Sequence, residues 1–255
     1  MRIVAVGHEP LPPKAWPAIR LFLWYFGAQL IAGVVVALIL IVSVGLGGGD
    51  IRTSVAPVLA EYLVPITVLT LLASAWILSH KARHALPAAA WPKVLASLGW
   101  RPALRSEMSL GILLGVAFGA AYLFSLTQLF PPGSHQSFGG MATAVSRSPV
   151  SSHLLFAIAA VLLVPPVEEF LFRGLLLAGF GYSWGAVPAM VGVTALFVAG
   201  HAFETHSYWP ALLSITVVAC VALTLRLRTN SLWPGIRLQA SYNAVLMTAL
   251  FFHTA

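Results

Sequence analysis

The hydrophobic residues of this chain fall into seven long stretches separated by short, more polar segments. The stretches run over Leu21–Leu46, Tyr62–Leu78, Met108–Phe130, His153–Phe180, Gly185–Ala202, Trp209–Leu225 and Leu232–Phe252. An α-helix rises 1.5 Å per residue, so about 20 apolar residues cross a hydrocarbon core about 30 Å thick. Each stretch has, or nearly has, that length. The pattern therefore predicts an all-α fold, a polytopic membrane bundle of about seven transmembrane helices.

Composition supports this prediction and excludes other classes of protein. The chain has 255 residues, of which 59% are hydrophobic and 8% are charged, whereas soluble domains carry about 25% charged residues. So few charges exclude a soluble enzyme, a disordered chain and a nucleic-acid binder. The single cysteine, Cys220, excludes an intramolecular disulfide and a cysteine-rich metal site. We expect the partners to be the lipid bilayer and a membrane peptide, with no nucleic acid.

The lysines and arginines predict an orientation for the bundle. Ten lie before the first stretch, between the second and third, or between the sixth and seventh, segments that an even number of spans places on one side, namely Arg2, Lys14, Arg20, Lys81, Arg83, Lys93, Arg101, Arg105, Arg226 and Arg228. Only Arg52 and Arg147 lie in segments on the other side. The positive-inside rule therefore predicts a multi-pass cell-membrane protein with a cytoplasmic N-terminus. Residues 1–150 form a first unit with a basic cytoplasmic loop, and residues 151–255 form a second unit of four spans.

Three glycines repeat at four-residue spacing in the third stretch, at Gly111, Gly115 and Gly119. This spacing places them on one face of a helix, where a second helix can approach closely. A lipid or substrate path along the same face is the alternative. We favour packing.

Two of the seven acidic residues, Glu168 and Glu169, are adjacent inside the fourth stretch. Carboxylates at membrane depth are costly and mark functional sites by default. Arg173 follows Glu169 by four residues, a spacing at which helical side chains are neighbours and can pair. This predicts a structural ion pair between Glu169 and Arg173, and it leaves Glu168 as the reactive carboxylate. The alternative is that both glutamates only hold the bundle together through Arg173.

His201 is placed by the turn that the sequence predicts over Gly181–Gly185. Two antiparallel helices joined there bring Glu169 and His201 to a similar depth. A carboxylate and an imidazole at one depth form an acid–base pair that can polarise water. A histidine that merely packs between helices is the alternative reading.

The last stretch carries Gln239 and Asn243, four residues apart and so on one helical face. Their amide N–H groups can donate to a developing oxyanion, or they can form hydrogen bonds between helices. The spacing alone does not separate these readings. His201 and His206 superficially resemble a zinc motif, but a five-residue spacing does not place them on one face.

These residues resemble one known family. Glu168-Glu169-Phe-Leu-Phe-Arg173 is similar to its EExxxR motif, and Phe197-Val-Ala-Gly-His201 is similar to its FxxxH motif. The segment from Ser231 through Asn243 resembles its third block, normally HxxxN. The family is CPBP, also called Abi, which includes type II CAAX prenyl proteases and bacteriocin-processing enzymes. The resemblance covers roughly Ser151 to Ala255.

The resemblance implies an intramembrane endopeptidase in which Glu168 activates the attacking water with help from His201. It also implies that Glu169 pairs with Arg173 and that Asn243 stabilises the oxyanion. The chain departs from the family at Gln239, where a histidine is usual. Gln239 can replace a hydrogen-bond donor but neither a proton carrier nor a metal ligand. We therefore expect no cofactor, with zinc disfavoured, and an activity that Gln239 reduces. The alternative is an inactive relative that serves as a bacteriocin-immunity or scaffold protein.

Overall fold

The computed structural model describes residues 13–47, 51–85, 91–131, 150–205 and 208–254. All regular secondary structure in these ranges is helical, which confirms the predicted all-α fold. The first elements are α1 (Ala15–Leu46), α2 (Ile51–Ala85), α3 (Trp91–Ser97) and α4 (Arg105–Phe124), which continues as the π-helix η1 (Ser125–Leu129). Next come α6 (Val150–Ile158), η2 (Ala159–Leu163), α7 (Val164–Glu168), η3 (Glu169–Leu176) and α8 (Leu177–Trp184). The last are α9 (Ala186–Thr205), α10 (Trp209–Thr229) and α11 (Trp233–Thr254).

Each of the seven predicted stretches is helical in the structure. Among the described residues, five helical stretches are long and apolar enough to cross a membrane. The apolar part of α9, Ala186–Ala202, is shorter, and polar residues such as Gln239 and Asn243 interrupt the 22-residue α11. Large apolar side chains such as Leu30 and Ile31 are exposed along α1, as lipid-facing residues are. The chain is thus a multi-pass membrane helical bundle.

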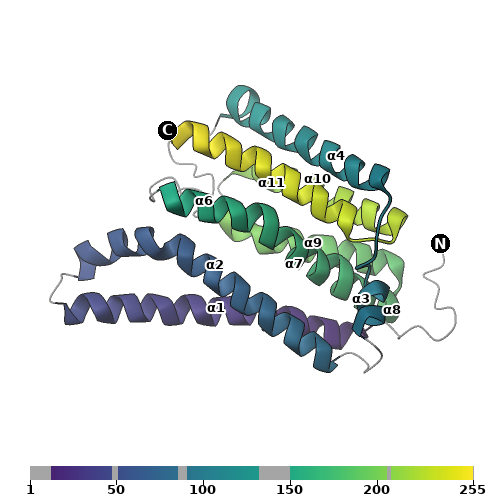
Figure 1. Ribbon diagram of the computed structural model, residues 1–255, viewed down its shortest axis with the longest axis horizontal. Helices are drawn as coiled ribbons and strands as arrows, with labels where there is room; N and C mark the ends of the chain where they lie inside the picture. Colours follow the sequence, from purple (N-terminus) through teal and green to yellow (C-terminus); the bar gives the residue numbers. More distant parts are fainter. Residues whose placement is uncertain (1–12, 48–50, 86–90, 132–149, 206–207, 255) are drawn as a thin grey trace.

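The helices form layers (Figure 1). The hairpin of α1 and α2 lies on one side of the bundle, α4 and α11 lie on the opposite side, and α6–α9 lie between them. One buried cluster joins α1, α2 and α3 to η3, α8 and α9. A second cluster joins α10 to α11, with residues of α4 packed against it. The chain from Val150 to Trp184 contributes to the first cluster and carries both glutamates.

The turn before α9 differs from the predicted one. We expected Gly181–Gly185 to form it, but α8 continues to Trp184 and only Gly185 leaves the helical conformation, with φ of 89°. Two contacts hold the last turn of α8 in helical form. Ser183 Oγ accepts a hydrogen bond from the backbone N–H of Ala15 in α1, and Trp184 packs on Phe180 one turn earlier in α8 itself. Gly185, for which this φ is accessible, therefore makes the whole reversal.

The three glycines of α4 pack against α11, as favoured from their spacing. Gly111, Gly115 and Gly119 are buried. A Cβ on Gly115 would collide with the Leu238 carbonyl oxygen and the Ser241 hydroxyl. The stripe therefore sets how closely α4 approaches α11.

Replacing Gly115 with alanine is expected to lower the free energy of unfolding by about 1–3 kcal/mol, because the added methyl group must displace the backbone of α11. Thermal unfolding of the purified protein in detergent measures the change. Gly33→Ala is the matched control, since a Cβ there meets nothing within 4 Å. Equal melting temperatures for the two variants would contradict the packing role.

Candidate active site

The adjacent carboxylates of Glu168 and Glu169 lie in opposite environments. Glu168 ends α7 and Glu169 begins η3. The Glu169 side chain is fully buried, whereas that of Glu168 is 18% exposed. A reacting carboxylate must meet water and substrate. Of the two glutamates, only Glu168 is accessible to them.

Glu169 belongs to a buried polar network. Its Oε1 lies 3.0 Å from Nη1 of Arg173, so the pairing predicted from their spacing is present. The same oxygen accepts a hydrogen bond of 2.9 Å from Nε2 of Gln239. Arg173 also donates through Nη2 to the carbonyl oxygen of Ala219. The network thereby joins η3 to α10 and α11.

Gly235 lets α11 approach this network. A Cβ at Gly235 would collide with the Glu169 carboxylate. No spacing in the sequence marks this position, because the need for glycine arises only where two helices meet. Any larger residue there would push Glu169 or α11 aside.

Arg226 does not lie in a loop, although the hydrophobic pattern predicted that it would. It lies inside α10, is only 8% exposed, and donates through Nε to the carbonyl oxygen of Arg173 at 3.3 Å. Its Nη1 donates to Oδ1 of Asn230 at 2.7 Å. The helix extends beyond the predicted Leu225 to Thr229. Asn230, in the left-handed conformation, ends it there.

His201 lies beside Glu168. Its Nε2 is 3.9 Å from Oε1 of Glu168, and its side chain is 31% exposed. The other ring nitrogen, Nδ1, is 2.9 Å from the carbonyl oxygen of Phe197. A carbonyl only accepts, so Nδ1 carries the proton and the lone pair of a neutral ring is on Nε2. The separation from Glu168 exceeds a direct hydrogen bond and suits a water within reach of both groups.

Phe197 separates the two carboxylate environments. Its ring packs on His201 at 4.7 Å between centroids, and the Arg173 guanidinium lies 4.3 Å from the ring centroid. The same residue therefore orients the histidine, through its ring and its carbonyl, and contacts the cation of the buried network.

Asn243 bonds to a neighbouring helix. Its Nδ2 donates to the carbonyl oxygen of Ala160, in η2, at 2.7 Å. In the π-helical register that carbonyl would accept from the N–H of residue 165, which is Pro165 and has none. Asn243 therefore satisfies a carbonyl that the proline leaves without its backbone donor. Of the two roles that the spacing allows, this contact is the hydrogen bond between helices.

The structure thus groups the predicted residues in two sets. Glu168 and His201 form an accessible pair, and Glu169, Arg173 and Gln239 form the buried network. His206 lies outside the described residues. Within the described part of the chain, no group of three or more His, Cys, Asp or Glu side chains could hold a metal ion.

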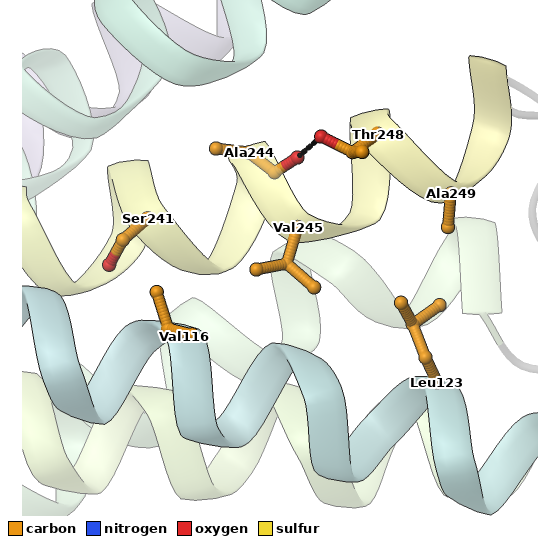
Figure 2. Close-up of a pocket in the computed structure, with 7 residues that line it drawn as sticks. All are labelled: Val116, Leu123, Ser241, Ala244, Val245, Thr248 and Ala249. Carbon is orange, nitrogen blue, oxygen red and sulfur yellow. Dashed lines mark hydrogen bonds between the residues drawn. The ribbon is translucent and has the colours of Figure 1, made fainter. Parts of the chain in front are cut away.

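A separate groove lies between α4 and α11, away from these residues. It is open and almost wholly apolar, with a volume of about 390 Å³. Figure 2 shows its lining, which consists of Val116, Leu123, Ser241, Ala244, Val245, Thr248 and Ala249. The Thr248 hydroxyl donates to the carbonyl oxygen of Ala244 in its own helix. The groove offers no titratable group for chemistry.

One comparison with known proteins bears on this arrangement. Residues 150–245 match the family described as "Type II CAAX prenyl endopeptidase Rce1-like". This segment, called the Rce1-like segment from here on, is similar to that family. The match confirms the resemblance to CAAX proteases, and the Rce1-like segment contains Glu168, Glu169, His201 and both amides of α11. No curated protein and no solved structure gave a match.

Proposed function

We propose that this chain is an intramembrane endopeptidase that hydrolyses a peptide bond of a membrane-associated peptide or protein. The observation that carries the proposal is the 3.9 Å separation between Glu168 Oε1 and His201 Nε2. A water within reach of both groups donates one hydrogen bond to the carboxylate and one to the imidazole. The Rce1-like sequence of residues 150–245 supports the same reaction class.

In the proposed reaction, Glu168 takes a proton from this water, and the oxygen attacks the carbonyl carbon of the scissile bond. His201 orients the water through its Nε2 lone pair. The tetrahedral intermediate then collapses, the C–N bond breaks, and the proton held by Glu168 passes to the leaving amine. The reaction consumes one water and needs no metal or organic cofactor, so activity is expected to survive a metal chelator.

We assign the oxyanion contact to Asn243 and a supporting role to Gln239. An asparagine amide has two N–H donors, and the bond to Ala160 uses one of them. Gln239 donates to Glu169, so it holds the buried carboxylate, a task that its amide can perform. We further propose that the protein resides in the cell membrane with a cytoplasmic N-terminus, as its basic segments favour.

The function is tested by comparing the peptide termini in membrane fractions from cells that produce the wild type, Glu168→Gln or neither. We expect new termini with the wild type alone, because an amide cannot accept the proton of water. Glu107→Gln is the matched control: Glu107 lies at the start of α4, where its carboxylate accepts from the N–H of Leu104, and glutamine serves in such a cap. Identical termini for wild type and Glu168→Gln at equal expression would favour a scaffold or immunity role.

A further inference from the structure

Helix α1 lies outside the Rce1-like segment, yet one of its faces packs against both parts of the site. The ring of Phe22 contacts that of Phe172 at 5.8 Å between centroids, and Phe172 precedes Arg173. Phe26, one turn after Phe22, lies 4.7 Å from it between centroids and 3.9 Å from where a Cβ of Gly200 would stand. This face of α1 therefore contacts the glutamate-bearing segment and the histidine-bearing helix together.

A chain of aromatic rings leads from α1 to the proposed catalytic histidine. Besides Phe22, the ring of Phe172 contacts that of Phe197, edge to face, at 5.1 Å between centroids and an angle of 79°. The ring of Phe197 in turn packs on that of His201 at 4.7 Å. Phe172 and Phe197 are 2% and 3% exposed. In a close-packed interior, such rings hold one another in position.

His201 depends on this support because its own surroundings are open. Its side chain is 31% exposed, so few neighbours restrain its rotamer. The bond from Nδ1 to the Phe197 carbonyl oxygen fixes the tautomer, and the Phe197 ring restrains the plane of the imidazole. A displacement of about 1 Å in a catalytic group can lower a rate about 10²-fold. The orientation of the Phe197 ring therefore matters to the proposed reaction.

We propose that Phe22 is a positioning residue, which holds the imidazole of His201 through the rings of Phe172 and Phe197. The inference rests on the proposed function and adds a residue of α1 to a site otherwise built from residues 150–245. Removing the Phe22 ring leaves a gap beside Phe172 that the surrounding residues fill only in part. The rings of Phe172 and Phe197 then shift, and the imidazole loses its fixed orientation. Arg173, whose guanidinium lies 4.3 Å from the Phe197 ring centroid, still restrains that ring, so the loss is partial.

The first test is kinetic. Wild type, Phe22→Leu and Phe118→Leu are assayed in proteoliposomes on an internally quenched, farnesylated peptide that ends in a CAAX sequence. We expect Phe22→Leu to lower kcat roughly 10-fold with KM unchanged, because it disturbs the orientation of a catalytic group and not the binding of the peptide. Phe118→Leu is the matched control: Phe118 is also partly buried, but it lies in α4 and packs against the second hydrophobic cluster. An unchanged kcat for Phe22→Leu, or an equal fall for Phe118→Leu, would overturn the positioning role.

The second test needs no substrate and observes the imidazole directly. The protein is isotope-labelled at histidine, and nitrogen NMR spectra are recorded in detergent at a pH where imidazole is neutral. The signals that disappear in His201→Gln are those of the His201 ring. Wild type and Phe118→Leu are expected to show one tautomer, with the proton on Nδ1, whereas Phe22→Leu is expected to show the second tautomer as well. Identical His201 signals in all three proteins would overturn the proposal.

The two tests also separate this proposal from the proposed function. If the wild type leaves the peptide intact, the proposed function fails for this peptide class, and the NMR spectra alone decide whether Phe22 holds His201. If wild type and Phe22→Leu cleave the peptide at the same rate, the proposed function stands and the positioning role of Phe22 fails.

Discussion

Replacing Arg173 with methionine is expected to lower the free energy of unfolding by about 3–5 kcal/mol. Glu169 would lose the cation that lies 3.0 Å from it, while its carboxylate stays fully buried. Its Oε2 has no hydrogen-bond partner among the described residues, so Gln239 would be the remaining donor to the side chain. A buried carboxylate with one hydrogen bond costs far more than an apolar side chain of similar volume.

Melting temperature and the yield of purified, monodisperse protein measure this effect. Arg228→Met, at an exposed position of α10, is the matched control and is expected to change stability by less than about 0.5 kcal/mol. Adding Glu169→Gln to Arg173→Met removes the uncompensated charge and is expected to recover part of the loss. Similar melting temperatures for Arg173→Met and the wild type would show that the pair does not hold the bundle together.

Glu168→Gln and His201→Gln are each expected to lower kcat by about 10²–10⁴-fold, and the double variant is expected to be no slower than the slower single variant. The physical reason is that both side chains act on one water: once either is lost, that water is no longer held and activated. The rates are measured on the purified protein in proteoliposomes, with an internally quenched, farnesylated peptide that ends in a CAAX sequence as substrate.

The design separates catalysis from folding. Glu168 and His201 are both partly exposed, so both variants are expected to melt within a few degrees of the wild type. His80→Gln, at an exposed position of α2, is the control for replacing a histidine and is expected to keep full activity. If the two single effects multiply in the double variant, the residues act independently and the shared-water mechanism is wrong.

Local helical geometry explains which parts of the site could be predicted from sequence. The pairing of Glu169 with Arg173 follows from a four-residue spacing, which makes side chains neighbours on any helix. The similar depth predicted for Glu169 and His201 follows from their distances to the turn, and the structure places Glu168, the neighbour of Glu169, 3.9 Å from His201 although the turn shifts to Gly185 alone. A four-residue spacing and a depth along a helix need no knowledge of how helices rotate against one another, whereas the choice of the glutamate that faces His201 does.

Contacts between helices could not be predicted in this way. Gln239 and Asn243 share a helical face, yet Gln239 bonds to Glu169 and Asn243 bonds to Ala160. The second contact arises because Pro165 leaves the Ala160 carbonyl without its backbone donor. The burial of Arg226 likewise depends on how α10 is rotated and tilted against its neighbours.

The sequence by itself determined the all-α membrane architecture, the resemblance of residues 150–245 to the CAAX protease family and the ion pair within one helix. These depend on apolar length, motif spacing and helical periodicity, all of which are local along the chain. The tertiary structure decided which carboxylate is accessible and which donors surround the buried one. Those outcomes depend on close approaches at residues such as Gly115 and Gly235, where the lack of a side chain sets the distance and rotation between helices.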